Sequence, residues 1–440
     1  MSERAYVIGD LHLGAGNDDP LEDFRDDDVF ARFCERIAGP ETTLLLNGDI
    51  VDFAQIAPFE VPKAAYLLWP EPASMQKLET ALAAHPDFFA GLRALVAKGS
   101  RVRFLVGNHD LDMVFERVKH RMWEALGAPP SGQLSYDVGH HVFHGVHVEH
   151  GHHWTPENCP RVPLEFCYEG PGNQLYLERV WGTDFMLQFY NDLERTHPYA
   201  DNVKPMLTVA YHGLRQGWIG GRTLARFFLF LKSRLGAPGM SALPWTGILG
   251  ALLDGDAPPL RPNAAVAAFD DPSWRKVVKD RLADPTFARE LEEGLAELEP
   301  EERKLASAPT KVAADEPTLG TGGASAGGAA PATLGLFRED RELRAARDRL
   351  AAPGITHVVF GHTHAVVDGE LDGRLFNYGT WLPSLDLKSP HVAAKIAASG
   401  LTLDMLKDSS LYVADRRAVR IDTDPSGYQA QVRLVPHDAP

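Results

Sequence analysis

Two histidines near the C-terminal end of the chain, His362 and His364, have the spacing of paired metal ligands. They follow a short apolar run, residues 357–360, that is typical of a buried strand. Four other polar motifs also follow apolar, β-rich runs: Asp10-Leu11-His12, Gly48-Asp49-Ile50-Val51-Asp52, Gly107-Asn108-His109-Asp110 and His150-Gly151-His152. Any one of these motifs alone is typical of an ordinary polar turn. All five together, each after a predicted strand, indicate one shared site.

The side chains in these motifs offer nitrogen and oxygen donors and no sulfur. Taken as ligands they are Asp10, His12, Asp49, Asn108, His150, His362 and His364. Several imidazoles suit first-row divalent metals such as Mn, Fe, Ni or Zn better than Mg or Ca. Seven donors exceed what one small ion usually takes. The set therefore predicts two ions that share a bridging carboxylate, with a hydroxide between them as the nucleophile.

His109 is a candidate for proton transfer rather than for metal binding. It follows the ligand Asn108 and precedes Asp110, which could hydrogen-bond one ring nitrogen and set its tautomer. An imidazole there could stabilise charge on phosphoryl oxygens or protonate the leaving group. In the fourth motif, His152 or His153 stays open as the ligand in place of His150.

The elements that must position these residues alternate over the first 110 residues. Predicted strands at 5–8, 42–46 and 101–106 are separated by helical patterns at 26–38 and 74–97. This β-α-β-α-β order implies parallel strands with right-handed crossovers. Sites form beyond the carboxyl ends of such strands, so Asp10, Asp49 and Asn108 are expected to converge.

The rest of the chain leaves this rhythm and then returns to it. Residues 134–149 read as a strand pair, and 175–195, 202–216, 221–235 and 273–298 read as helices. Strands are predicted again at 355–360, 375–378, 410–414, 417–422 and 428–435. We therefore assign 1–153 and 337–440 to the domain that holds the motifs, 154–304 to a helical insertion that caps it, and 305–336 to a flexible Ala/Gly/Pro-rich linker.

Composition limits the range of partners and locations. The formal net charge of −16 argues against a large nucleic-acid footprint, because such footprints are basic. Three cysteines without framework spacing indicate a reducing compartment and no structural disulfides. The sequence shows neither a signal-peptide pattern nor an apolar run of about 18 residues, so a cytoplasmic location is expected.

The ordered set of five motifs resembles the calcineurin-like metallophosphoesterase superfamily over residues 4–152 and 353–381. Members of that superfamily are similar in fold, so the resemblance implies an α/β sandwich of two mixed sheets flanked by helices, with a dinuclear site at the strand ends. Within the superfamily, Gly48-Asp49-Ile50-Val51-Asp52-Phe53 and Asn377-Tyr378-Gly379-Thr380-Trp381 resemble bacterial UDP-diacylglucosamine hydrolases. Those enzymes usually have arginine where this chain has His109.

The resemblance also implies roles for individual residues. One ion would be held by Asp10, His12, Asp49 and His364, and the second by Asp49, Asn108, His150 and His362. Asp49 would then be the bridge, His109 the catalytic histidine and Asp110 the acid that orients it. Asp52 would lie behind the ligands and steady the loop after the second strand.

The expected function is metal-dependent hydrolysis of a small-molecule or lipid-like phosphodiester or pyrophosphate, with Mn favoured. The alternatives are a nuclease of the same superfamily and a non-catalytic protein-binding scaffold on the same fold. A duplex nucleic acid is not the expected substrate. Residues 222–235 form a basic amphipathic pattern that fits either an ordinary packed helix or peripheral membrane contact. The sequence does not determine the oligomeric state.

Overall fold

The computed structural model describes residues 3–61, 67–155, 158–162, 164–196, 202–204, 206–225, 272–293, 336–424 and 430–439. The chain divides into two compact units, Met1–Val209 with Arg341–Pro440, and Ala210–Asp340. Residues 154–209, which we assigned to the insertion, are thus grouped with the unit that holds the motifs. The predicted linker at 305–336 lies outside the described residues except for its last position.

A six-stranded mixed sheet forms one layer of the first unit, in the order β16-β15-β1-β2-β4-β5. Its strands are β1 (Arg4–Ile8), β2 (Thr42–Asn47), β4 (Arg101–Leu105), β5 (Leu134–Asp137), β15 (Arg417–Thr423) and β16 (Ala430–Pro436). Strands β1, β2, β4 and β5 are parallel, and β15 and β16 add antiparallel at one edge. The predicted alternation is confirmed for β1, β2 and β4, which are parallel with helices between them, although the unpredicted strand β3 (Leu67–Pro70) follows β2.

A five-stranded mixed sheet forms the second layer, in the order β12-β13-β11-β7-β6. Its strands are β6 (His140–Phe143), β7 (Val146–Glu149), β11 (His357–Phe360), β12 (Val366–Gly369) and β13 (Leu375–Tyr378). The three central strands are parallel, and both edge strands are antiparallel to their neighbours. The predicted strand pair at 134–149 is in fact three strands, because β5 joins the first sheet and β6 and β7 join the second.

The two sheets pack face to face through alternate side chains of their strands. From β1, Ala5 and Val7 enter a core with Val148 and Val359 of the second sheet. Tyr6 of the same strand points the other way, into the larger core beneath the helices. Burial of both faces explains why these parallel strands are apolar without alternation. The predicted α/β sandwich of two mixed sheets is therefore confirmed.

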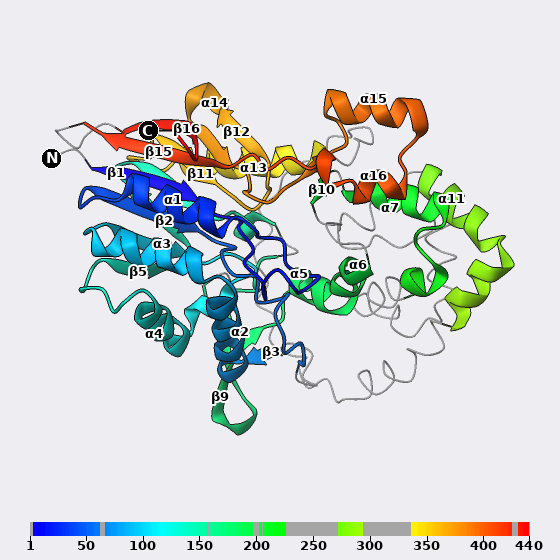
Figure 1. The fold of residues 1–440 in the computed structure, drawn as a ribbon, viewed down its shortest axis with the longest axis horizontal. Helices are drawn as coiled ribbons and strands as arrows, with labels where there is room; N and C mark the ends of the chain where they lie inside the picture. The colour runs from blue at the N-terminus through cyan, green and yellow to red at the C-terminus, as the bar shows by residue number, and fades with distance from the viewer. Residues whose placement is uncertain are drawn as a thin grey trace, which may run out of the picture. The chain divides into compact units, whose positions relative to one another are not determined.

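Helices cover the outer face of each sheet (Figure 1). Phe30 and Phe33 of α1 pack in the core beside the first sheet, with the neighbouring α3. Ala345 and Ala346 of α13 pack on Val358 of the second sheet. The helices of this unit include α1 (Asp27–Ile37), α2 (Glu71–Ala84), α3 (Pro86–Ala97), α4 (Glu116–Ala125), α14 (Glu370–Gly373), α15 (Pro390–Ser399), α16 (Leu403–Lys407) and, from Arg341 on, α13 (Leu336–Leu350).

Two predictions of secondary structure are wrong. The helix expected from residue 175 begins only at α5 (Trp181–Phe185) and continues to α6 (Asn191–Thr196), because β9 (Gln174–Glu178) pairs with β3 (Leu67–Pro70) and β8 (Cys167–Gly170). This pairing was not visible in local periodicity. The strand expected at 410–414 is a 3₁₀ turn at Ser409–Leu411, where the Asp408 carboxylate accepts the Ser410 N–H.

A two-stranded sheet joins β10 (Val203–Lys204) to β14 (Leu385–Asp386). The helix α7 (Met206–Gln216) begins in the first unit and ends in the second, which also contains α11 (Pro272–Leu282). In it, the Gly221 N–H donates to Glu290, and Arg222 pairs with Glu293 at 3.2 Å. Of the amphipathic range 222–235, only 222–225 is described. Among the described residues, none of the helices is both long and apolar enough to cross a bilayer.

His85 links three parts of the first unit through two carboxylates. Its Nε2 lies 3.1 Å from Glu22 and its Nδ1 lies 3.1 Å from Asp27. Glu22 in turn accepts the backbone N–H groups of Gly14 and Gly16, in the loop that follows His12. Burial opposes the charge of the imidazole, but these two partners raise the pKa of His85 to about 9.

A raised pKa in the folded state makes the stabilising effect of His85 depend on pH. Its contribution is complete below the unfolded pKa of about 6.5 and is lost as the pH rises through about 9. In urea unfolding, the stability difference between wild type and His85→Gln should therefore shrink by roughly 3 kcal/mol between pH 6 and pH 10. His120→Gln, at an exposed histidine, is the control. An equal difference at both pH values would contradict the assignment.

Candidate metal centre

The predicted ligands come from loops at one edge of the two sheets. The loops after β1, β2, β4, β7 and β11 carry, in that order, Asp10 with His12, Asp49, Asn108, His150, and His362 with His364. Parallel strands end at the same edge, so side chains that are far apart in the sequence meet there.

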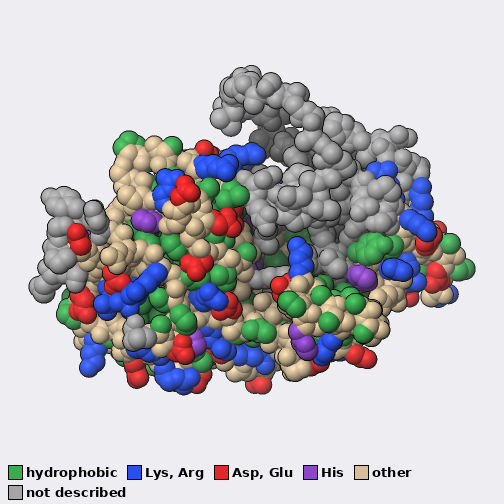
Figure 2. All heavy atoms as spheres, turned by 90° about the horizontal axis from the view of Figure 1, so that it is seen from above, with side chains coloured by type: hydrophobic (Ala, Val, Ile, Leu, Met, Phe, Trp, Pro, Cys, Tyr) green, Lys and Arg blue, Asp and Glu red, His purple; other side chains and the backbone are tan. Residues whose placement is uncertain are grey.

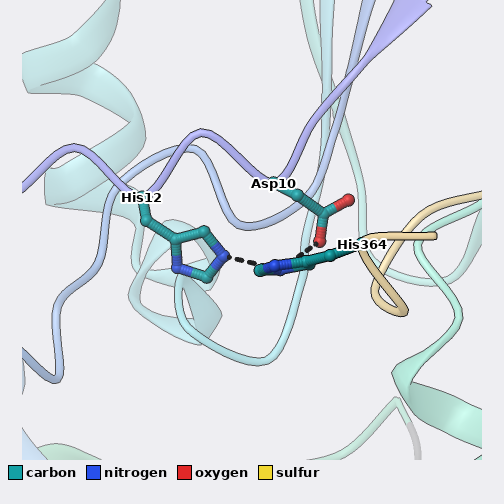
Figure 3. A group of neighbouring side chains, drawn as sticks. All are labelled: Asp10, His12 and His364. Carbon is teal, nitrogen blue, oxygen red and sulfur yellow. Dashed lines mark hydrogen bonds and ion pairs between the residues drawn. The ribbon is translucent and has the colours of Figure 1, made fainter. Parts of the chain in front are cut away.

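The first group of donors is Asp10, His12 and His364, whose ligand atoms lie within 4.8 Å of one another. The Nε2 atom of His364 lies 3.2 Å from Nε2 of His12 and 3.2 Å from the Asp10 carboxylate (Figure 3). Two atoms that bind one ion at about 2.1 Å each are about 3 Å apart. These separations fit a first-row divalent ion.

The second group is Asp49, His150 and His362, again within 4.8 Å. His150 Nε2 lies 3.1 Å from Asp49 Oδ2 and 3.2 Å from Asn108 Oδ1. The same Asp49 oxygen lies 3.9 Å from His12 Nε2 of the first group. Asp49 is thus near both groups, as a bridging carboxylate must be.

The geometry also bears on the alternatives in the fourth motif. His150 faces Asp49, and its Nδ1 is held by the backbone carbonyl of Asn47 at 2.9 Å. His152 belongs to neither donor group, although it is buried and its ring nitrogens have no hydrogen-bond partner. Burial and the neighbouring imidazoles His153 and His150 lower the pKa of His152. This arrangement favours His150 as the donor.

Unusual backbone conformations coincide with the ligands. Positive φ angles, which L-residues seldom adopt, occur at Asp10, His12, Asp49, His362 and His364, between 52° and 66°. Such strain persists where the surrounding structure enforces it, and it is frequent at functional sites. Next to Asp49, Gly48 also has a positive φ of 81°, and a Cβ there would lie 2.5 Å from the His150 ring. The strands and turns therefore hold these donors in place at an energetic cost.

Asp52, rather than Asp110, orients His109. The Nδ1 atom of His109 lies 2.7 Å from Asp52 Oδ2, and the same oxygen lies 3.0 Å from Nδ1 of His12. The Asp110 carboxylate instead accepts the backbone N–H groups of Ile50 and Gly107, at 2.9 and 2.6 Å. The expectation that Asp110 orients His109 is therefore wrong. Asp110 fixes the two loops that carry Asp49 and His109, because it can reach their backbones.

The buried carboxylates make this region attractive to positive charge. Burial opposes ionisation of Asp49, but the charge of His150 lowers the pKa of Asp49 well below its usual value. Burial likewise opposes the charges of His150 and His109, but nearby carboxylates raise the pKa of His150 to about 9 and that of His109 to about 10. Imidazoles that hold protons here would release them when a cation binds.

Burial acts in the other direction on Asp110. It raises the pKa of Asp110 to about 7, and the charge of Asp49 adds to the effect. Burial also opposes the charge of Asp52, but the charges and hydrogen bonds of His109 and His12 lower the pKa of Asp52. Asp52 is therefore the ionised partner of His109, as an orienting carboxylate must be.

The segment after β13 supports the ligand loops from behind. Thr380 donates to the backbone carbonyl of Asp10 at 2.7 Å, and Asn377 donates to that of Gly361 at 3.1 Å. The Tyr378 hydroxyl donates to the carbonyl of Asn47 at 3.1 Å. These hydrogen bonds hold the loops that carry the proposed ligands. The same segment, residues 377–381, is the one that resembles the bacterial branch of the superfamily.

Residues that sequence analysis missed hold the loop 53–56, which follows Asp52. Lys77 of α2 is fully buried and donates to the carbonyls of Phe53 and Ile56, at 2.8 and 2.6 Å. Asn191 of α6 donates to the carbonyl of Ala54 at 2.8 Å, and Glu194 accepts from Gln55 at 2.6 Å. The only signal in the sequence was a lysine next to Leu78, on the buried side of a helix.

Lys77→Met should destabilise the first unit and loosen the loop 53–56, which follows Asp52. It leaves two buried carbonyls without this donor, at a cost of about 1–3 kcal/mol each, so a loss of roughly 2–5 kcal/mol is expected. The same substitution at an exposed lysine, Lys98→Met, is the control. Urea unfolding followed by tryptophan fluorescence measures the difference. Equal stability of the two variants would contradict this role for Lys77.

Imidazole and carboxylate donors thus form a candidate metal site at the strand ends of a two-sheet sandwich. A family model described as calcineurin-like phosphoesterase matches residues 3–228, just over half of the chain. The chain belongs to the calcineurin-like phosphoesterase family, and this membership supports a metal-dependent activity on phosphoesters.

Other comparisons add little. None of the curated proteins matches the chain. Among solved structures, the protein of unknown function AQ665 from Aquifex aeolicus is 15% identical over 37% of this chain and 67% of its own, with a TM-score of 0.20. The narrower resemblance to UDP-diacylglucosamine hydrolases therefore stays a prediction.

Proposed function

We propose that this protein hydrolyses a small-molecule or lipid-like phosphodiester or pyrophosphate with two divalent transition-metal ions, Mn being favoured. The observation that carries the proposal is the position of Asp49, which is within reach of both donor groups and accepts the backbone N–H of His109 at 2.9 Å. When bound, two such ions would supply Lewis acidity to the phosphoryl oxygens and make a water molecule a better nucleophile.

Separate residues of this chain would hold the two ions and act on the substrate. Asp10, His12, Asp49 and His364 would hold one ion, and Asp49, Asn108, His150 and His362 the other. Because Asp52 binds Nδ1 of His109, Nε2 of that ring is left for the substrate. From there His109 would stabilise charge on a phosphoryl oxygen or protonate the leaving group.

Charge favours a small substrate over duplex nucleic acid. The net charge is −16, and on the face drawn in Figure 2 the described Lys and Arg side chains are interspersed with Asp and Glu. Phosphate-backbone recognition relies on a continuous basic surface. The preference for a lipid-like substrate, peripheral membrane contact through 222–235 and the cytoplasmic location remain predictions from the sequence.

Hydrolysis of two chromogenic substrates tests the proposal. The full-length protein, stripped of metal and reloaded with Mn²⁺, would be given bis-p-nitrophenyl phosphate, p-nitrophenyl phosphate and single-stranded DNA, with His109→Ala as the control. We expect Mn-dependent cleavage of the diester that falls strongly in the variant. Faster cleavage of the monoester would indicate a phosphomonoesterase, and cleavage of DNA alone would indicate the nuclease alternative. Two bound ions without turnover of any substrate would favour a scaffold.

A further inference from the structure

The segment that follows His150 surrounds the ring of His362. Thr155 Oγ1 lies 3.0 Å from Nε2 of His362, and Asn158 Nδ2 lies 3.2 Å from the same nitrogen. The Trp154 ring lies edge-on to the His362 ring, with centroids 5.9 Å apart. The sequence motifs did not include Thr155 or Asn158, and neither residue is among the proposed metal ligands. Two polar side chains thus contact the same ring nitrogen of a proposed metal ligand, which indicates that they orient its ring.

The direction of the Thr155 hydrogen bond limits the protonation of His362. The Thr155 hydroxyl donates its single hydrogen to the backbone carbonyl of His152 at 2.9 Å. With its hydrogen on that carbonyl, the hydroxyl can only accept toward His362, which assigns the hydrogen of that ring to Nε2. A neutral imidazole with hydrogen on Nε2 has its lone pair on Nδ1, and only an unprotonated nitrogen binds a metal.

We propose that Thr155 and Asn158 are positioning residues that fix His362 as the Nε2–H tautomer and thereby present Nδ1 to the ion of the second donor group. Two N–H groups cannot bond to each other, so Asn158 would take part through Oδ1, after a 180° rotation of its amide. The inference rests on the proposed function, because it names the residues that complete the second site.

The two donor groups provide an internal comparison. The Nε2 atom of His364 faces Asp10 and His12 of the first donor group. The Nε2 atom of His362 instead contacts Thr155 and Asn158. The backbone N–H of His362 is held separately, at 3.0 Å from both oxygens of Asp10. Loss of the Thr155 hydroxyl should therefore change the ring of His362 without moving its backbone. It should weaken the second ion and leave the first unchanged.

Titration calorimetry of the full-length, metal-free protein with Mn²⁺ tests this. Wild type should bind two ions. Thr155→Val, which keeps the shape and removes the hydroxyl, should weaken the second ion by about 10- to 100-fold, the usual effect of losing a residue that holds a metal ligand. Thr155→Ser should restore the wild-type affinity. Asn158→Asp, which can only accept, should bind the second ion at least as tightly as wild type, whereas Asn158→Leu should bind it more weakly.

The outcomes separate this inference from the function on which it rests. Two ions in wild type and an unchanged second affinity in Thr155→Val would overturn the inference alone. So would a loss in Asn158→Asp as large as in Asn158→Leu, because Nε2 would then be the acceptor. Fewer than two ions in wild type would overturn the dinuclear function and the inference together. Circular dichroism and retention of the first ion show that each variant is folded.

Discussion

Asp49→Ala should lose both ions and lower Mn-dependent diester hydrolysis by roughly 10³-fold or more. The Asp49 carboxylate lies 3.1 Å from His150 of one donor group and 3.9 Å from His12 of the other, so its removal affects both. Metal ions contribute several kcal/mol to stabilising the transition state of phosphoryl transfer, and each 1.4 kcal/mol corresponds to about tenfold in rate. Metal content by mass spectrometry and steady-state rates measure the two effects.

Asp18→Ala is the matched control, since it removes a carboxylate from an exposed position. It should keep two ions and the wild-type rate. Asp49 also accepts the backbone N–H of His109 at 2.9 Å, so the Ala variant can shift that loop as well. Asp49→Asn keeps an acceptor oxygen for this bond and removes only the charge. Two ions retained by both Asp49 variants would show that the bridge is assigned to the wrong residue.

His109→Ala should lower kcat by about 10²–10⁴-fold while both ions stay bound. The ring of His109 is grouped with His12 and Asp52 rather than with Asp49, His150 and His362, and its Nδ1 is engaged by Asp52 at 2.7 Å. The ring would act on the substrate through Nε2. The loss should be larger for an alkyl leaving group than for p-nitrophenolate, because only the poorer leaving group needs a proton. An equal loss for both would favour charge stabilisation on the phosphoryl oxygens instead.

Two further variants separate the carboxylates near His109. Asp52→Asn should lower kcat and also weaken the first ion, because Asp52 Oδ2 contacts Nδ1 of both His109 and the proposed ligand His12. Asp110→Asn should act mainly on stability, because Asp110 binds the backbone N–H groups of Ile50 and Gly107. If Asp110→Asn reduced kcat and spared stability, the hydrogen-bond pattern described for Asp52 would be contradicted.

The sequence was sufficient for the features that depend on strand ends. Asp10, Asp49 and Asn108 follow three parallel strands, and that topology alone brings them to one edge. The motif with His362 and His364 lies beyond the helical region, yet β11 pairs with β7 and returns both histidines to the site. Local periodicity and the right-handed crossover rule were enough for these residues.

Contacts between loops could not be predicted from the sequence. Asp110 is adjacent to His109, and adjacency suggested that the two side chains interact, but the turn directs the Asp110 carboxylate to the backbone of Ile50. The partner of His109 is Asp52, which is 57 positions away. The pairing of β9 with β3 and the contacts of Thr155 with His362 depend in the same way on neighbours that are distant in the chain.

Anomalous scattering from crystals of the Mn-loaded protein tests the central claim most directly. We expect two Mn peaks about 3.5–4 Å apart, both next to Asp49. One peak should lie among Asp10, His12 and His364, and the other among Asn108, His150 and His362. A single peak, or peaks away from Asp49, would contradict the dinuclear centre on which the proposed function rests.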